Sequence, residues 1–382
     1  MNDSNGLDTA ASLTASPELP VTGLSDELGR QIAGVVQESG GWIGFDRFMA
    51  EALYRPGLGY YANRLVKFGA TPESDFVTAP EMTPLFGDVL ARQVAQALQS
   101  TRTFEIWEFG AGTGALAQHL LDGLAALGQR VDRYTIVDLS ETLIDRQRQR
   151  LSRFGAQVCW ASELPDAMHG VVVGNEVLDA MPVQLLARVG GQWFERGVVV
   201  HATQGFCWAD RPTLLRPPLE IAGDHDYLTE IHAQGEAFVR TLAQRLQRGA
   251  VFLLDYGFPE AEYYHPQRHM GTVMCHRAQQ ADGNPLVDVG CKDITAHVNF
   301  TGIALAAQDA GLEVLGYTSQ AHFLLNCGLA EAMQSAPLPQ RAMAQKLLME
   351  HEMGELFKVL GLVKGAPFDA LGFSRGDRSH RL

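Results

Sequence analysis

Cysteine is scarce in this sequence: five residues are spread over 382 positions, and no two form a Cys-x-x-Cys pair. Disulfide-rich folds and zinc fingers need denser or paired cysteines, so the sequence argues against both. The cluster of His265, His269, Cys275 and His276 matches no standard zinc-ligand spacing, and we expect no metal site. An odd, sparse set of thiols is typical of a reducing compartment.

Long apolar runs and a basic N-terminal segment are also lacking. The apolar run 251–254 is far shorter than the about 18 residues that a membrane-spanning helix needs. The first 29 residues contain five acids but no Lys or Arg, which argues against a secretory signal and an Arg-rich mitochondrial leader. We therefore expect no membrane span and a cytoplasmic location.

Basic residues are outnumbered, because 30 Lys and Arg face 44 Asp and Glu, which gives a formal net charge of −14. Nucleic acids and anionic membranes need a basic face, so this balance disfavours both as partners. A cationic small molecule or a basic segment of a protein fits better. The hydrophobic share of 46% is ordinary for a globular protein and is enough for a full core.

The order of the predicted elements indicates an α/β fold. Strands and helices alternate over 104–174, and the buried run 250–256 predicts a further strand. This spacing predicts a doubly wound, mostly parallel sheet with right-handed crossovers. The segment 183–208 is β-rich with a turn at Gly190-Gly191, and it predicts an antiparallel insertion.

Helices are predicted on both sides of this pattern. Ser25 is the expected N-cap of a helix that ends near Val36, and Asp293 is the expected N-cap of a helix over 293–310. A last helix is predicted over 343–360, and 257–292 is expected to be irregular. The expected regions are a disordered tail (1–24), an N-terminal helical and lid region (25–100), an α/β core (101–182 and 233–365), a β-rich insertion (183–232) and a C-terminal tail (366–382).

The clearest single motif is Glu108-Phe109-Gly110-Ala111-Gly112-Thr113-Gly114, which follows a predicted strand and opens a predicted helix. Glycines let the backbone turn sharply and approach a ligand, and open α/β folds bind nucleotides at this edge of the sheet. Asp138 ends the next strand, where a carboxylate can accept both ribose hydroxyls. The motif therefore predicts a nucleotide-containing ligand.

Two ligands compete for this loop. Gly110-x-Gly112-x-x-Ala115 also satisfies the dinucleotide pattern, so NAD stays open. However, Glu108 would face a pyrophosphate badly, whereas it suits the ammonium of an amino-acid moiety. S-adenosylmethionine carries such an ammonium and no phosphate, so we favour it.

A second candidate constellation, Asn175-Glu176-Val177-Leu178-Asp179-Ala180-Met181-Pro182, follows the strand near 171–174. Asn175 and Glu176 leave that strand at the same edge as the glycine loop, where chemistry would occur, whereas Asp179 serves equally well as a turn residue. Pro182 stands alone with no aromatic after it, unlike the Pro-Pro-aromatic motif of DNA amino-methylases. A nucleobase substrate is therefore disfavoured.

On these segments the chain resembles the MidA-like S-adenosylmethionine-dependent methyltransferases, which include a mitochondrial complex I assembly factor that methylates a protein arginine. The matching segments are Gly57-Leu58-Gly59-Tyr60-Tyr61, Asp75-Phe76-Val77-Thr78-Ala79-Pro80-Glu81, the glycine loop, the Asn175 segment, Asp255-Tyr256-Gly257 and Asp293-Ile294-Thr295-Ala296-His297-Val298-Asn299-Phe300. The resemblance implies a class I, Rossmann-like methyltransferase fold. It also implies S-adenosylmethionine as cofactor, S-adenosylhomocysteine as product, and a partner protein with an exposed arginine, with subunits of respiratory complexes among the candidates.

The predicted site has three parts. The cofactor part comprises Glu108, Gly110, Ala111, Gly112, Gly114, Asp138, Leu139 and Asn175. The catalytic candidates are Glu176, Asn175 and His297, and the substrate or lid candidates are Tyr60, Tyr61, Asp75, Thr78, Pro80 and Glu81. Glu176 is expected to bind a guanidinium through paired, charge-assisted hydrogen bonds. Two other functions remain open: methylation of another protein side chain or a small molecule, and a cofactor-binding assembly protein with little turnover.

Overall fold

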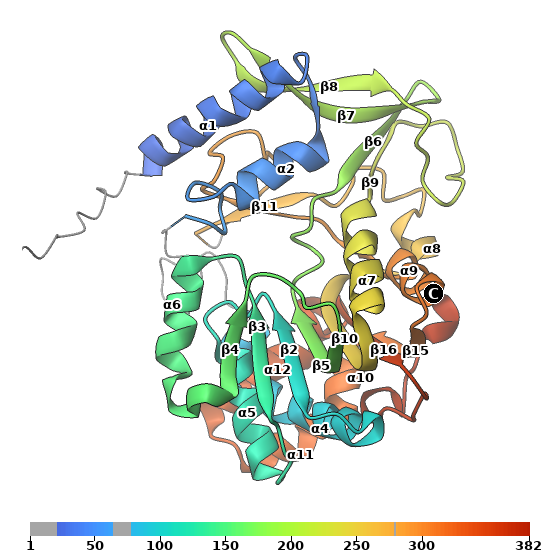
Figure 1. The fold of residues 1–382 in the computed structure, drawn as a ribbon. Helices are drawn as coiled ribbons and strands as arrows, with labels where there is room; N and C mark the ends of the chain where they lie inside the picture. Colours follow the sequence, from blue (N-terminus) through green and yellow to red (C-terminus); the bar gives the residue numbers. More distant parts are fainter. Residues whose placement is uncertain (1–20, 64–77, 279) are drawn as a thin grey trace, which may run out of the picture.

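The computed structural model describes residues 21–63, 78–278 and 280–382, and the chain forms two lobes (Figure 1). The lower lobe in this view holds the sheet β15-β16-β10-β5-β2-β3-β4. Its strands are β2 (Glu105–Phe109), β3 (Arg133–Val137), β4 (Val158–Ala161), β5 (Met168–Asn175), β10 (Leu246–Phe258), β15 (Glu313–Ser319) and β16 (Phe357–Lys364). The strands β4, β3, β2, β5 and β10 are parallel, as predicted.

Helices cover both faces of this sheet, so the doubly wound prediction is confirmed. One face packs against α4 (Pro84–Thr101) and α5 (Ala115–Ala126), together with the C-terminal helices α10 (Gln320–Asn326), α11 (Leu329–Ser335) and α12 (Leu338–Leu348). The other face packs against α7 (Ala233–Arg245) and α9 (Phe300–Asp309). The helix α6 (Glu141–Arg150) connects β3 to β4, with a 3₁₀ turn at Ser152–Gln157.

The upper lobe is built around an antiparallel sheet, as predicted for the insertion. Its strands are β1 (Ile43–Gly44), β6 (Gln184–Val189), β7 (Gln192–His201), β8 (Gly205–Pro212) and β9 (Tyr227–Ile231). Gly190 and Gly191 have φ of 55° and 78°, which is the hairpin geometry that the Gly-Gly pair indicates. The helices α1 (Val21–Glu38) and α2 (Phe45–Tyr54) pack on this sheet. Because β1 pairs with β7, the N-terminal segment and the insertion share one sheet.

Shorter elements complete the fold, and several of them line the space between the lobes. They are α3 (Ala79–Met82), α8 (Glu260–Tyr263), β11 (Met274–Arg277), β12 (Gln280–Asp282), β13 (Asp293–Thr295) and β14 (Val298–Asn299). Residues 257–292 therefore hold regular structure, contrary to the expectation of an irregular stretch. The division into regions otherwise stays a prediction, and residues 1–20 lie outside the described part.

Two predicted helix starts were wrong. Val21 rather than Ser25 opens the first helix, and Asp293 lies in β13. The helix after it begins at Phe300, where the Asn299 side chain caps it by accepting from the Gly302 N–H at 3.3 Å. The apolar residues Ile294, Ala296 and Val298 alternate with polar ones, which is the spacing of a strand, and the prediction wrongly extended the following helix over them. The segment 293–295 pairs with β11 as a strand.

The predicted helix over 343–360 was wrong in its second half. A π-helical turn (Glu350–Gly354) follows α12, and β16 then runs antiparallel to both β10 and β15 in the middle of the sheet. A fully buried apolar run cannot be assigned to helix or strand from its periodicity alone. The alternation expected of a half-buried strand is absent because both faces of β16 are covered.

The expected C-terminal tail packs on the same sheet. Phe373, in a 3₁₀ turn at Leu371–Phe373, lies over Gly316 and Gly361, where an added Cβ would come within 2.1 Å and 2.5 Å of its ring. The Tyr317 N–H also donates to Asp377 at 3.0 Å. Residues 366–382, including a last 3₁₀ turn at Ser379–Arg381, are therefore part of the folded core rather than a tail. Within the described residues, none of the helices has the length and apolar character to cross a membrane.

Candidate active site

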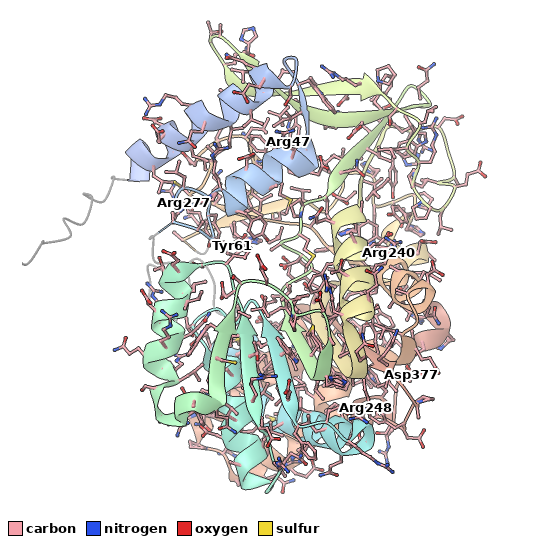
Figure 2. All side chains as sticks on the ribbon, viewed as in Figure 1. Arg47, Tyr61, Arg240, Arg248, Arg277 and Asp377 are labelled. Carbon is pink, nitrogen blue, oxygen red and sulfur yellow. The ribbon has the colours of Figure 1, made fainter. Side chains whose placement is uncertain are left out.

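A cavity of about 1660 Å³ lies between the lobes, above the carboxyl ends of β2, β3 and β5. Its lining includes residues of α2, α3, the glycine loop, β8, β10, β11 and β13. Figure 2 shows Tyr61 between the upper elements and the strand ends of the core. The cavity is thus located where open α/β sheets bind ligands.

The glycine loop turns from β2 into α5 as its composition predicts. Gly110, Gly112 and Gly114 have φ of 61°, 52° and 84°, a region that L side chains rarely adopt. A Cβ added to Gly112 would meet nothing within 4 Å, so the backbone there borders open space. Gly110, Ala111 and Gly112 line the cavity, whereas Gly114 caps α5 and faces Gln147 and Leu151.

Glu108 lies at the end of β2 with only 2% of its surface exposed. The Tyr134 hydroxyl donates to it at 2.8 Å. Burial raises the pKa of Glu108 to about 8, and the nearby charge of Asp138 adds to the effect. A carboxyl group that is buried among acids and lines a cavity is suited to receive a cation, since an opposite charge favours its ionised form.

Asp138 is held in place from two sides. The Ser140 N–H donates to its Oδ1 at 2.9 Å, and the Gln147 side chain donates to its Oδ2 at 2.7 Å. Gln147 also donates to the Gly112 carbonyl at 2.9 Å and accepts from the Trp160 indole at 2.9 Å. Gln147 therefore fixes the acid and the glycine loop relative to each other. The sequence analysis missed Gln147, since a polar residue inside a charged helix gives no signal of its own. Leu139 is 70% exposed and lines the cavity.

Glu176 follows β5 in a left-handed conformation, with φ of 55°. This conformation is uncommon for a residue with a side chain, and such strain concentrates at functional sites. Its carboxyl accepts from the Asn175 side chain at 2.8 Å and from the Ala79 N–H. Burial raises the pKa of Glu176 to about 8, and the charge of Asp179 adds to the effect. The Asn175 Oδ1 is buried without a partner among the described residues.

Three further acids surround Glu176, and none of them was among the catalytic candidates predicted from the sequence. Asp179 is 4% exposed and Asp255 is 1% exposed. Burial raises the pKa of Asp179 to about 6, although Tyr256 donates a hydrogen bond to it. Asp255 accepts from the Leu178 and Asp179 N–H groups, so it fixes the turn after β5. Asp293, which accepts from the Tyr61 hydroxyl at 2.8 Å, reaches the same cavity from β13.

His297 lies on the cavity wall between β13 and β14, with its ring 5.2 Å from that of Tyr256 and 5.3 Å from that of Phe258. Burial lowers its pKa to about 4, with the charges of Arg268 and Lys358 adding to the effect. Its Nδ1 is buried without a partner in the described part of the chain. His297 is therefore a neutral imidazole at neutral pH.

The predicted lid residues separate into two groups. Tyr61, Thr78, Pro80 and Glu81 line the cavity, whereas Tyr60 is 1% exposed and belongs to the hydrophobic core of the upper lobe. Asp75 lies outside the described residues. Glu81 bonds to the hydroxyl of Thr113 in the glycine loop and forms an ion pair with Arg150 of α6 at 3.0 Å.

The chemistry of these groups suits S-adenosylmethionine. Glu108 offers a carboxyl for an ammonium, Asp138 offers one for ribose hydroxyls, and the open side of Gly112 leaves room for the ligand. No group of three or more His, Cys, Asp or Glu side chains in the described residues has metal-binding geometry.

Comparison with known proteins supports this assignment. A family model described as "Putative S-adenosyl-L-methionine-dependent methyltransferase" matches residues 89–318, which is more than half of the chain. A crystal structure from Burkholderia thailandensis with bound S-adenosyl-homocysteine is 46% identical, covers 96% of this chain and all of its own, and superposes with a TM-score of 0.91. A second structure from that organism is 45% identical, covers 96% of this chain and all of its own, and has a TM-score of 0.87.

Curated relatives are more distant. "Protein arginine methyltransferase NDUFAF7 homolog, mitochondrial" of Drosophila melanogaster is 27% identical, over 88% of this chain and 86% of its own. The human protein of that name is 25% identical, over 90% of this chain and 84% of its own. These relatives are named as mitochondrial, which contradicts the cytoplasmic location expected from the sequence. That expectation was wrong because sparse thiols and an acidic first segment do not distinguish one reducing compartment from another.

Proposed function

Because the chain belongs to this family of S-adenosyl-L-methionine-dependent methyltransferases, we propose that its methyl acceptor is an arginine side chain of a partner protein. The observation that carries the proposal is the acidic wall formed by Glu176 and the buried Asp179 and Asp293 at the cofactor edge of the sheet. In the described residues, no Lys or Arg side chain forms an ion pair with Glu176 or Asp179. Buried carboxylates are costly without a cation, so this wall favours a cationic guest.

The geometry favours a guanidinium over an ammonium. A planar guanidinium presents its donors as a fork, and neighbouring carboxyl groups can accept several of them at once. Glu176 and Asp179 lie close enough for the charge of one to raise the pKa of the other. The names of the curated relatives, which are protein arginine methyltransferases, agree with this choice.

The rest of the cavity suits a peptide rather than a small, compact molecule. Six of the eleven methionines in the chain line it: Met82, Met181, Met270, Met274, Met343 and Met353. Methionine side chains adapt their shape to varied partners. The volume of about 1660 Å³ exceeds that of most small-molecule sites, which reach about 1,000 Å³.

In the proposed mechanism, bound S-adenosylmethionine supplies a methyl group that its sulfonium has already activated. Glu108, Asp138 and the loop around Gly110 and Gly112 hold the cofactor, with Asn175 beside it. Glu176 orients one guanidinium nitrogen and draws positive charge toward the others, so that positioning supplies most of the rate. The departing proton leaves during or after the transfer, and a neighbouring carboxylate accepts it more readily than His297, whose lowered pKa disfavours the protonated ring.

The test uses tritiated S-adenosylmethionine, a cell lysate as the source of acceptors, and the wild-type protein beside Glu176→Gln. We expect tritium in a protein band with the wild type and a loss of about 100-fold with the variant, while S-adenosylhomocysteine still binds to both. Glu313→Gln is the matched control, since Glu313 is exposed at the start of β15. Tritium only in the small-molecule fraction would contradict the proposal, and no transfer at all would favour an assembly protein with little turnover.

A further inference from the structure

The cavity has an acidic end and a cationic side, and the cationic side has no role in the proposed methyl transfer. Arg268 lines the cavity, and its guanidinium carbon lies 3.7 Å from the centre of the Phe258 ring. The residue is exposed, and no carboxylate in the described part of the chain forms an ion pair with it. Its charge reaches into the site, because it lowers the pKa of His297.

A continuous wall of aromatic rings joins the two ends. Tyr256 donates to Asp179 at the acidic end, and its ring lies 5.2 Å from that of His297. The His297 ring lies 5.3 Å from that of Phe258, which carries Arg268 on its face. These successive contacts place the Arg268 guanidinium within about six extended residues of the acidic end.

The backbone that carries Arg268 is fixed rather than loose. The Leu228 N–H of β9 donates to the carbonyl of His269 at 2.9 Å. The buried Glu230 accepts from the N–H of Thr272 at 2.6 Å, and the Thr272 hydroxyl accepts from the N–H of His297 at 3.0 Å. Arg268 therefore stands in a defined position relative to His297.

A second cation nearby, Lys358, is not available to bind a ligand. The Lys358 side chain is 5% exposed, its ammonium lies 5.8 Å from the Phe258 ring, and it forms an ion pair with Glu355 at 3.6 Å. Lys358 is thus neutralised within the fold, whereas Arg268 faces the cavity without a carboxylate. Exposed methionines flank Arg268, since Met270 is 79% exposed and Met274 is 40% exposed.

We propose that Arg268 forms a carboxylate-binding subsite, so that the enzyme prefers arginines that have a carboxylate within about six residues. The inference rests on the proposed function, because it assumes that the guanidinium of the acceptor occupies the acidic end. The planar fork of Arg268 binds a carboxylate through two hydrogen bonds, and stacking on Phe258 keeps that fork oriented. The carboxylate is an acidic side chain or the C-terminus of the acceptor chain.

The test is a library of peptides with one central arginine and varied neighbours, methylated by the wild-type protein and scored by kcat/KM. One arm compares acidic with amide neighbours, and a second compares a free C-terminal carboxylate with its carboxamide. We expect a preference of about tenfold for the carboxylate in at least one arm. Arg268→Gln should abolish that preference while leaving the rate with neutral peptides within about twofold, and Arg268→Lys should restore part of it.

Arg248→Gln is the control, because Arg248 is exposed at the opposite end of β10 from Phe258 (Figure 2). It should keep the full preference. If the wild type methylates arginine peptides without regard to carboxylates, or if Arg268→Gln keeps the preference, the subsite is wrong and the proposed function stands. If no arginine peptide and no arginine in lysate proteins is methylated, the proposed function fails and the subsite with it.

Discussion

The two ends of the cavity are built in different ways. Most of the proposed cofactor end comes from one stretch of chain, 108–147, which contains the end of β2, the glycine loop, β3 and most of α6, and Asn175 at the end of β5 lies beside it. The acceptor end is assembled from Glu176 after β5, Asp293 in β13, His297 before β14 and Tyr61 in the upper lobe. The cofactor end is thus a local supersecondary structure, whereas the acceptor end exists only after the lobes have packed.

This difference separates the cofactor site, whose architecture many α/β enzymes share, from the acceptor site, which is specific to this enzyme. A strand, a glycine turn and an acid on the next strand form a nucleotide-binding edge in many open α/β folds, since the fold positions them directly. The proposed acceptor end also depends on the N-terminal region and on the segments after β10, which supply Tyr61, Asp293 and His297. The choice of methyl acceptor must therefore be argued from the assembled site and not from the fold.

The largest expected effect is a loss of methyl transfer without a loss of cofactor binding. Glu176→Gln keeps the shape of the side chain but removes the charge that binds the acceptor, so kcat should fall by about 100-fold. The dissociation constant of S-adenosylhomocysteine should change by less than about twofold. Calorimetry measures the dissociation constant, and single-turnover kinetics measure the rate of methyl transfer. If cofactor affinity and transfer rate fell by the same factor, Glu176 would not act at the acceptor end alone.

The second prediction concerns a substitution at the cofactor end, which should weaken cofactor binding and leave the rate of methyl transfer nearly unchanged. Asp138→Asn removes the charged acceptor of ribose hydroxyls, and the dissociation constant of S-adenosylhomocysteine should rise by about 30-fold. With saturating cofactor, kcat should stay within about threefold of wild type. Gln147→Leu should weaken binding by a smaller factor, since Gln147 orients Asp138 from behind. A large loss of kcat at saturation would show that Asp138 acts at the acceptor end as well.

The pH dependence of cofactor binding tests the ionisation of Glu108. Its pKa is raised to about 8, so the carboxyl is mostly protonated at pH 6, and a bound ammonium has to displace the proton. The affinity for S-adenosylhomocysteine should therefore rise with pH, by up to about tenfold per unit between pH 6 and 7.5. Calorimetry in buffers of different ionisation enthalpy should reveal the release of a proton on binding. An affinity that does not change with pH would contradict the raised pKa of Glu108.

Stability without ligand should follow the opposite trend. The pKa values of Glu108 and Glu176 are raised to about 8 in the folded protein from an ordinary value of 4.5. A group of this kind contributes stability below its unfolded pKa, and that contribution is lost as pH rises through the folded pKa. The Tm of the unliganded protein should fall from pH 6 to pH 8.5, and S-adenosylhomocysteine should raise Tm more at pH 8.5 than at pH 6.

The smallest expected effect concerns the link between the ends. The α3 segment donates the Ala79 N–H to Glu176 and bonds through Glu81 to Thr113 of the glycine loop and to Arg150. Arg150→Gln should therefore raise the dissociation constant of S-adenosylhomocysteine and lower kcat, each by about threefold to fivefold. Arg148→Gln, at an exposed position of the same helix, is the control. An effect confined to one end would show that the ends act independently.

The residues that the sequence predicts for the cofactor end carry local signals. The glycine spacing, the acid of β3 and the strand–helix order all lie within about forty residues, and the structure brings Glu108, Gly110, Gly112 and Asp138 to one cavity. Asn175 and Glu176 were found for a similar reason, since they directly follow a recognisable strand. Gln147 was missed because its contacts reach across β3 and the loop, and no short pattern encodes them.

The acceptor end was predicted only in part because its contacts are tertiary. Asp293 was interpreted as a helix cap, yet it lies in a strand and contacts Tyr61, 232 positions away. Tyr60 was grouped with Tyr61, although neighbouring residues face different sides and Tyr60 belongs to the core. The strand β16 was interpreted as a helix because burial on both faces hides the period of two.

The most direct test of the central claim is the chemical form of the transferred methyl group. Proteins labelled by the wild-type enzyme with tritiated S-adenosylmethionine can be hydrolysed to amino acids and separated against standards. The acidic wall around Glu176 predicts that tritium elutes with a methylated arginine, and that Glu176→Gln removes this peak. Tritium that elutes with methylated lysine, histidine or glutamine would contradict the assignment of the acceptor end.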